Sequence, residues 1–298
     1  MRNGERSLHH LEKIVALGAL AAALALSIGF AQAGDRKGAP KSPARSDEVF
    51  LRSAVALVQD AASGETLIAK NQSAVLPIAS ITKLMTAMVI LDAGVSLEQR
   101  VAISDEDYDL VKGTRSRLRP GTVLTRDELL LLALMASENR AAFSLARTYP
   151  GGPAAFVAAM NAKARSLGMN DTQFTDPTGL SSANVSTAQD LAQLVRAAHE
   201  YPLIRQYSTR ESATVHAFGR ALDFRNTNRL VRNAHWDIGL SKTGYISEAG
   251  RCLVMRVRLA SREVIMVLLD SWGRLSRVGD ANRIRKWLEA NALKGPRG

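Results

Sequence analysis

Cysteine, aromatic residues and long apolar runs are scarce in this sequence of 298 residues. The single cysteine, Cys252, excludes an internal disulfide, and its apolar neighbours indicate a buried, inert thiol. Aromatic residues make up 5% and charged residues 22%, which argues against a membrane or fibrous protein. Hydrophobic residues still make up 46%, so the chain can bury a sizeable core.

The motifs of several enzyme classes are absent as well. No glycine-rich phosphate loop follows a strand-like run, and no group of His, Cys and Asp has the spacing of a zinc site. Beyond residue 33 the histidines are His199, His216 and His235, and no G-x-S-x-G motif accompanies them, which disfavours a Ser-His-Asp triad. We therefore expect chemistry that uses neither a metal nor a cofactor.

The N-terminal segment has the pattern of a signal peptide. Basic residues precede an uncharged apolar run at residues 14–30, and Ala-Gln-Ala at residues 31–33 matches a cleavage site. A membrane anchor is the competing interpretation, but the run is short for a spanning helix. We expect cleavage after Ala33, a flexible leader at residues 34–46, and no stable membrane span afterwards.

The chain is strongly basic. Its net charge is +11, and removal of residues 1–33, with three basic and two acidic side chains, leaves +10. Nucleic acid is disfavoured as a partner, because an exported chain rarely meets it and the aromatic residues do not interleave with the basic ones. An anionic polymer or membrane surface fits better, and solvated surface charge is the alternative.

Apolar patterning predicts strands at both ends of the chain and helices between them. The expected strands are residues 53–58, 65–69, 240–245, 253–259 and 264–270, and the expected helices are residues 80–93, 129–135, 153–167, 187–198 and 280–293. This order predicts an α/β (α+β) domain at residues 47–293, followed by a tail at 294–298. Its antiparallel sheet would use residues 47–100 and 230–293, with an all-helical subdomain inserted at residues 101–229.

The first chemical signal is Ser80-Ile81-Thr82-Lys83. Residues three apart share a helix face, so Lys83 can reach the Ser80 hydroxyl. Lys83 is the only charged residue between Lys70 and Asp92, and an apolar setting lowers the pKa of a lysine. A neutral amine beside a hydroxyl is the base that a nucleophilic serine needs. The competing interpretation is a core-helix lysine that extends to solvent.

Two further signals lie downstream. Ser137-Glu138-Asn139 offers a hydroxyl and an amide; the same S-x-N pattern recurs at residues 182–184, but we favour the first copy because it follows a helix. Lys242-Thr243-Gly244 lies on an expected strand. Its lysine would supply a positive charge for a substrate carboxylate, its threonine a hydroxyl donor, and its glycine space for a substrate backbone.

Together these motifs resemble those of the penicillin-binding proteins and β-lactamases, in the same order. Residues 77–86, 137–141, 176–180 and 240–245 look like the small D-alanyl-D-alanine peptidases, and the resemblance covers about residues 49–290. It implies a β-lactamase/transpeptidase-like fold. It also implies a periplasmic serine hydrolase that cleaves D-alanyl cross-links of peptidoglycan stem peptides and that β-lactam antibiotics inhibit covalently.

The resemblance implies a role for each candidate residue. Ser80 would form the acyl-enzyme, Lys83 would accept its proton, and Ser137 would complete the catalytic group. Backbone N–H groups of Ser80 and Tyr245 would form an oxyanion hole. The substrate-binding residues would be Asn139, Lys242, Thr243, Gly244 and Tyr245.

Three alternatives to an endopeptidase remain. Glu138 stands where carboxypeptidases of this group commonly have glycine, and the chain ends without room for their additional β-domain, so we expect an endopeptidase rather than a carboxypeptidase. A class A β-lactamase is disfavoured because no E-x-x-L-N stretch lies between Asn139 and Lys242. A non-catalytic penicillin sensor is the rival from another class.

Overall fold

A computed structural model describes residues 49–109 and 112–292. The expected signal peptide, leader and tail lie outside these residues. Within the described ranges, no helix is both long and apolar enough to cross a membrane.

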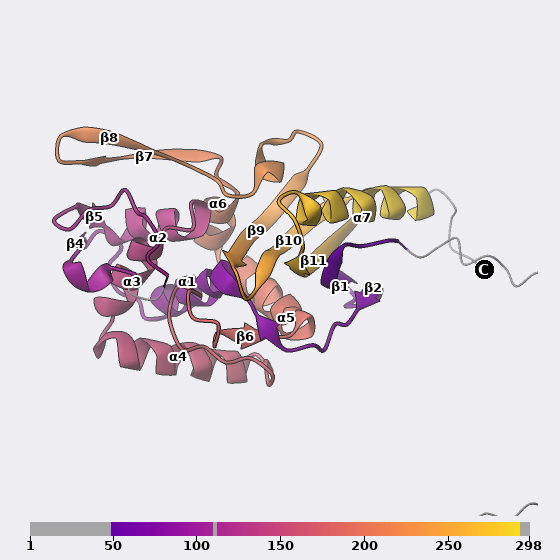
Figure 1. Ribbon diagram of the computed structural model, residues 1–298, viewed down its shortest axis with the longest axis horizontal. Helices are drawn as coiled ribbons and strands as arrows, with labels where there is room; N and C mark the ends of the chain where they lie inside the picture. The colour runs from indigo at the N-terminus through magenta and orange to yellow at the C-terminus, as the bar shows by residue number, and fades with distance from the viewer. Residues whose placement is uncertain (1–48, 110–111, 293–298) are drawn as a thin grey trace, which may run out of the picture. The chain divides into compact units, whose positions relative to one another are not determined.

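A five-stranded antiparallel sheet runs through the molecule in the order β2-β1-β11-β10-β9 (Figure 1). Its strands are β1 (Ser53–Asp60), β2 (Thr66–Lys70), β9 (Asp237–Ile246), β10 (Gly250–Leu259) and β11 (Arg262–Ser271). The first strand therefore pairs with the last one, as the sequence predicted for a sheet completed by both termini.

Both faces of this sheet are covered, which explains the apolar runs of its strands. Successive strand residues point to opposite faces. Val55 and Leu57 of β1 accordingly join the core on the side of α5 (Ala188–His199), whereas Ala56 and Val58 join the core under α7 (Ser276–Ala292). Figure 1 shows α7 above the sheet and α5 below it.

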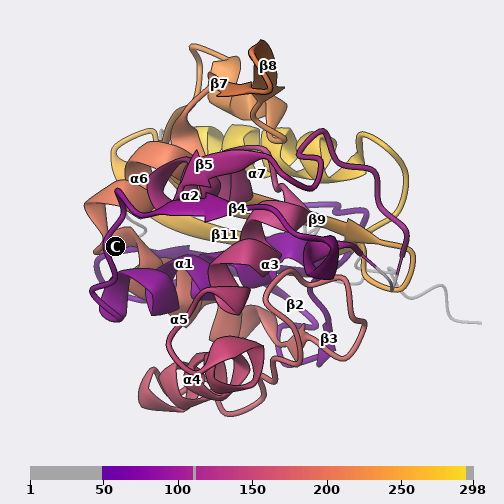
Figure 2. The same cartoon turned by 90° about the vertical axis from the view of Figure 1, so that its left-hand side faces the viewer.

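Most of the insertion is helical (Figure 2). Its helices and those leading into it are η1 (Ala79–Thr82), α1 (Lys83–Asp92), η2 (Asp105–Asp107), α2 (Arg126–Met135), α3 (Asn139–Arg147), α4 (Gly152–Ser166), α6 (Pro202–Thr209) and η3 (Arg229–Arg232). A capping box begins α2, because the Thr125 hydroxyl accepts from the Glu128 N–H at 3.1 Å.

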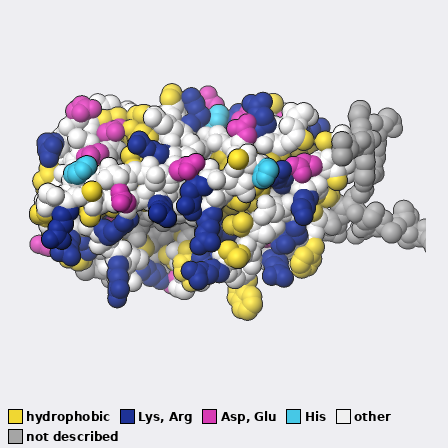
Figure 3. All heavy atoms as spheres, turned by 90° about the horizontal axis from the view of Figure 1, so that it is seen from above, with side chains coloured by type: hydrophobic (Ala, Val, Ile, Leu, Met, Phe, Trp, Pro, Cys, Tyr) yellow, Lys and Arg dark blue, Asp and Glu magenta, His cyan; other side chains and the backbone are white. Residues whose placement is uncertain are grey.

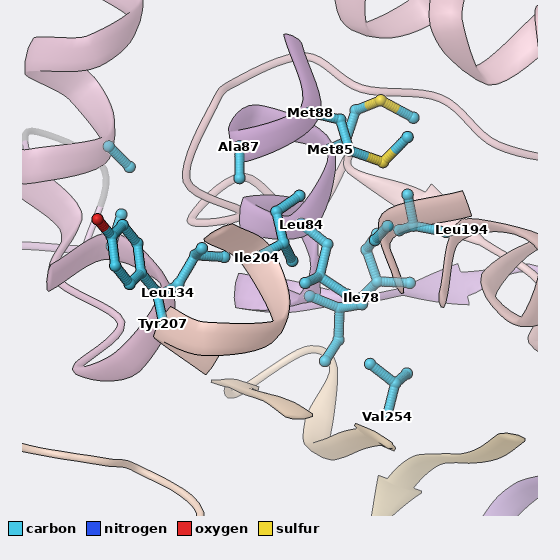
Figure 4. Packing of buried hydrophobic residues seen from close by; sticks show 14 of the residues in the cluster. Ile78, Leu84, Met85, Ala87, Met88, Leu134, Leu194, Ile204, Tyr207 and Val254 are labelled. Atoms are coloured by element: carbon cyan, nitrogen blue, oxygen red, sulfur yellow. The ribbon is translucent and has the colours of Figure 1, made fainter. Parts of the chain in front are cut away.

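Helix α1 lies in the centre of the larger core. Figure 4 shows Leu84, Met85 and Met88 of this helix among apolar residues of several other elements, including Leu194 of α5 and Val254 of β10. Because every residue from Lys83 to Ile90 is buried, the helix that follows Ser80 is fixed on all sides.

The insertion also contains short strands that the sequence analysis did not predict. These are β3 (Leu76–Pro77), β4 (Arg100–Ala102), β5 (Val123–Thr125), β6 (Val185–Ser186), β7 (Ser212–Ala217) and β8 (Arg220–Arg225). The β7–β8 hairpin alternates exposed and buried residues along β7, and its turn, Phe218-Gly219, has positive φ angles of 51° and 69°. This alternation is the signal that could have revealed the hairpin.

The first and last elements are joined by a buried carboxylate. Asp280 of α7 accepts hydrogen bonds from the backbone N–H groups of Arg52 (3.0 Å) and Ser53 (2.7 Å) and from the Ser53 hydroxyl (2.5 Å). The helix predicted at residues 280–293 starts earlier, at Ser276. Its first turns, through Asp280, are hydrogen-bonded to the beginning of β1.

Candidate active site

Ser80 lies in a tight turn just before a helix. We expected it in the first turn of one helix over residues 80–93, but residues Ala79–Thr82 form the 3-10 turn η1 and α1 begins at Lys83. Side chains three residues apart are eclipsed in a 3-10 turn. The Nζ atom of Lys83 accordingly lies 2.8 Å from Oγ of Ser80, as the spacing predicted.

Lys83 is completely buried and has three oxygen neighbours. Besides Ser80, its Nζ donates to Oδ1 of Asn139 and to the backbone carbonyl of Thr178, both at 2.7 Å. Burial lowers the pKa of Lys83 from 10.5 to about 7, although nearby carboxylates, foremost Asp176, partly offset this effect. The amine is therefore close to half deprotonated at neutral pH and can act as a base.

The carbonyl of Thr178 is held in position by a loop organised around Asp176. Its carboxylate accepts from the backbone N–H groups of Thr178 (2.6 Å), Gly179 (2.8 Å) and Ser181 (2.9 Å). Gly179 has a φ of +80°, and a Cβ atom there would lie 1.9 Å from the carbonyl oxygen of Ala79. Only glycine therefore lets this loop reach the turn that carries the serine.

The asparagine of the second S-x-N copy, Asn184, holds a loop in place. Asn184 is fully buried; its Oδ1 accepts from the backbone N–H groups of Thr175 (2.7 Å) and Asp176 (3.1 Å). Its Nδ2 donates to Oγ1 of Thr82 at 3.1 Å and to the carbonyl of Asp176 at 2.9 Å. This asparagine connects the Asp176 loop to η1.

Ser137 lies between α2 and α3, opposite Lys242 of β9. Its Oγ is 2.8 Å from Nζ of Lys242, and its φ of 59° is unusual for a residue with a side chain. Lys242 is 1% exposed and also donates to the carbonyl of Thr243 at 3.0 Å. Burial, together with the positive charges of Lys83 and Arg277, holds its pKa well below 10.5.

Gly244 allows β9 to pass against the serine turn. A Cβ atom on Gly244 would lie 2.8 Å from the carbonyl oxygen of Ile78 and 3.1 Å from the backbone nitrogen of Ser80. The absent side chain thus makes room for η1. On either side, Thr243 donates to Oγ1 of Thr227 at 2.6 Å, and the Tyr245 side chain is 57% exposed.

A cavity of about 520 Å³ opens over these residues. Six of the eight candidates line it: Ser80, Ser137, Asn139, Thr243, Gly244 and Tyr245. Lys83 and Lys242 lie beneath its surface, each within hydrogen-bonding distance of a serine that lines it.

Sequence analysis missed other residues of the cavity wall, above all Arg277. Its guanidinium donates to the carbonyls of Gly244 and Cys252, both at 3.0 Å, and it lines the cavity. Burial, followed by the nearby Arg251, lowers the pKa of Arg277 to about 10, so it stays protonated at neutral pH. Lys112 and Thr114 also line the cavity, and Thr114 accepts from Nδ2 of Asn139 at 3.0 Å.

A lysine of the cavity wall forms an ion pair. Lys112 contacts Glu248 in the turn between β9 and β10, and this contact lowers the pKa of the Glu248 carboxyl to about 2. The Glu248 carboxyl consequently remains deprotonated throughout the physiological pH range.

Comparison with known proteins fits this geometry. The model of the D-alanyl-D-alanine carboxypeptidase family matches residues 41–272. A D-alanyl-D-alanine endopeptidase of Pseudomonas aeruginosa is 50% identical over 246 residues, which are 82% of this chain and 79% of the relative. One of Escherichia coli is 46% identical over 273 residues, 91% of this chain and 87% of the relative.

A solved structure supports the same assignment. The DD-transpeptidase of a Streptomyces species superposes with a TM-score of 0.75 at 27% identity, covering 81% of this chain and 98% of that chain. The predicted transpeptidase-like fold is therefore confirmed. By sequence and by structure, the chain belongs to the D-alanyl-D-alanine carboxypeptidase family of serine peptidases.

Proposed function

We propose that this protein is a D-alanyl-D-alanine endopeptidase that cleaves peptidoglycan cross-links through an acyl-enzyme on Ser80. The observation that carries the proposal is the distance of 2.8 Å between Nζ of the buried Lys83 and Oγ of Ser80. A lysine with a pKa of about 7 can take the hydroxyl proton at neutral pH, and the serine oxygen can then attack a D-alanyl carbonyl.

The remaining residues have roles that follow from their positions. The oxyanion would be bound by the backbone N–H groups of Ser80 and Tyr245. Ser137 would return a proton to the leaving amine, because its hydroxyl lines the cavity and contacts Lys242. Arg277 offers a positive charge for a carboxylate beside Thr243, because it lines the cavity and a pKa of about 10 keeps its guanidinium protonated at neutral pH. Water would then release the acyl group from Ser80.

The preference for cross-links over terminal D-alanine rests on two observations. Ser137-Glu138-Asn139 carries a glutamate where carboxypeptidases of this group commonly have glycine, as noted from the sequence. Relatives named endopeptidases match at 50%, 46% and 38% identity, whereas those named carboxypeptidases match at 32% or less. A carboxypeptidase on the same scaffold is the second candidate.

The test supplies purified protein with a cross-linked muropeptide dimer and, separately, with an uncross-linked pentapeptide. We expect monomers from the dimer, little free D-alanine from the pentapeptide, and no product from Ser80→Ala. Rapid D-alanine release with an intact dimer would identify a carboxypeptidase. Labelling by penicillin without turnover of either substrate would identify a sensor.

We also propose a periplasmic location, reached by export and removal of residues 1–33. The support is the basic start, the apolar run and the Ala-Gln-Ala site of the sequence. Mass spectrometry of protein from the cell envelope should find an N-terminus at Gly34. Retention of the first 33 residues would indicate a membrane-anchored protein.

A further inference from the structure

A second, smaller cavity adjoins the first one. Its volume is about 150 Å³, and its wall includes Thr227, Asn228, Arg229, Arg251, Arg274 and Arg277. Thr227 and Arg277 line both cavities, so the two lie side by side. A molecule that is held at Ser80 and extends past Arg277 would reach the second cavity.

Four arginines converge here without a carboxylate among the lining residues. They come from separate elements: Arg229 from η3, Arg251 from β10, Arg274 from the segment before α7, and Arg277 from α7. Among the described residues, no ion pair involves Arg229, Arg251 or Arg274. Lys and Arg side chains also gather in the middle of the face in Figure 3. Uncompensated like charges in one hollow favour an anionic ligand.

The shape of the site favours a carboxylate on a peptide. Guanidinium groups match carboxylates with paired hydrogen bonds, and the beginning of α7 adds the positive end of a helix dipole. The space is large enough for one small acidic group. Arg251 stacks over the ring of Tyr245, with 4.5 Å between its Cζ and the ring centroid, so the arginine cluster is connected to the candidate oxyanion residue.

We propose that Arg229, Arg251 and Arg274 bind the free carboxylate of the leaving half of a cross-linked substrate. This inference rests on the proposed endopeptidase function. A carboxypeptidase releases a single amino acid, whose only carboxylate lies beside the scissile bond within reach of Arg277. An endopeptidase releases a whole peptide, which carries a further carboxylate at its own terminus. A second anionic subsite thus distinguishes cross-linked from terminal substrate.

The test uses the double variant Arg229→Gln/Arg274→Gln, because both side chains are exposed and have no hydrogen bond in the described structure that folding would lose. Arg220→Gln/Arg225→Gln, on exposed positions of β8, is the matched control that removes the same charge. Each protein is supplied with a muropeptide dimer whose leaving half ends in a free carboxylate, and with the same dimer amidated there. Penicillin labelling serves as a further control, because it measures acylation of Ser80 by a molecule that has no leaving peptide.

We expect the Arg229/Arg274 variant to lose about tenfold to a hundredfold in kcat/KM on the free-carboxylate dimer, as for charged hydrogen bonds. Penicillin labelling should stay unchanged, and the control variant should resemble wild type. Amidation should slow the wild-type protein to a similar extent and should affect the double variant, which keeps only Arg251 of the three arginines, much less.

Equal cleavage of both dimers by all three proteins would overturn the proposal. The proposal would also fail if the Arg229/Arg274 variant cleaved the dimers as wild type does but was retained less on intact cell walls. That result would mean that the arginines bind a polyanion of the wall. Failure of the wild-type protein to cleave either dimer would refute the endopeptidase function and the subsite with it.

Discussion

Gly244 and Ser80 lie so close together that a Cβ atom on the glycine would be 3.1 Å from the serine's backbone nitrogen. The lysine-bearing strand and the serine-bearing turn are thus packed backbone against backbone. Since that nitrogen is a proposed oxyanion donor, the distance between β9 and η1 determines the geometry of catalysis.

Gly244→Ala should abolish acylation while leaving a folded protein. The added methyl group would be 2.8 Å from the carbonyl oxygen of Ile78, so η1 must shift. Overpacking of this kind costs about 1–3 kcal/mol of stability. We expect penicillin labelling to fall by at least about a hundredfold, because a displaced oxyanion donor has effects of this size.

Gly239→Ala is the control in the same strand. Its Cβ atom would be tightest against the His199 ring, at 3.1 Å, which can move aside, and the Arg256 carbonyl oxygen lies at an ordinary contact distance of 3.8 Å. It should label normally. Equal labelling of wild type and Gly244→Ala would show that the close approach is not required.

Acylation should depend on the protonation of Lys83. Burial lowers the pKa of Lys83 to about 7, so the amine is protonated and inactive as a base below this pH and free above it. The rate of labelling by penicillin should therefore rise with pH around a midpoint near 7. A rate that is flat from pH 5 to 9 would contradict this role.

Lys83→Arg tests the same group by substitution. It keeps a cation but removes the base, because arginine stays protonated at every relevant pH. Labelling should fall by about 10²- to 10⁴-fold, the usual contribution of a general base. Normal labelling of this variant would mean that another residue takes the proton.

Asn184 should matter to both stability and acylation, although it does not line the cavity. Asn184→Ala leaves the backbone N–H groups of Thr175 and Asp176 without their acceptor, which costs about 2–4 kcal/mol. Asn184→Asp keeps the acceptor but loses the amide donor to Thr82 and to the Asp176 carbonyl. In urea unfolding, we expect the loss of stability of Asn184→Asp to lie between those of wild type and Asn184→Ala. Penicillin labelling should decrease in the same order, from wild type through Asn184→Asp to Asn184→Ala. Equal stability of all three proteins would contradict the structural role.

Asp280 should stabilise the fold in a pH-dependent way. Burial raises the pKa of Asp280, but hydrogen bonds from Ser53 and from the Arg52 N–H lower it by more. The pKa of Asp280 therefore lies below its usual value. Ionised Asp280 therefore stabilises the fold fully above the ordinary pKa of about 3.9, and this stabilisation is lost as the pH falls through the lower pKa of the folded state. Asp280→Asn should lower the free energy of unfolding by about 3 kcal/mol at pH 7. The difference from wild type should shrink below about pH 4.

Asp237→Asn provides the comparison for Asp280. Asp237 pairs with Arg258 at 3.4 Å on the surface, where both side chains are largely exposed. Such a pair contributes about 0–1 kcal/mol. A loss as large as that of Asp280→Asn would mean that burial is not what distinguishes them.

Short-range relationships were predictable from the sequence, and long-range ones were not. The contact between Ser80 and Lys83 follows from a spacing of three, which any helical turn converts into proximity. The approach of Lys242 to Ser137 spans 105 residues and was accessible only through resemblance to a family. Arg277 belongs to no motif, because it reaches the site only through the way α7 packs over β10.

In the fold, too, some elements were predictable from the sequence and others were not. Strands β1, β10 and β11 were predictable because both of their faces are largely buried and their sequences contain long apolar runs. The β7–β8 hairpin was missed because its strands are half exposed and rich in Ser, Ala and Arg. Asn184 likewise acts through backbone groups of an irregular loop, for which no periodic pattern exists.

The pairing of β1 with β11 has a consequence for the order in which the protein becomes active. Ser53 and Ser271 are hydrogen-bonded across 218 residues, so the ends of a very long loop must meet before the sheet can form. A chain still being synthesised already contains Ser80 and Lys83, but β1 has no β11 beside it and β9 does not yet close the site. Catalytic competence therefore arises only after nearly the whole polypeptide has been made, and incomplete chains cannot cut the substrate.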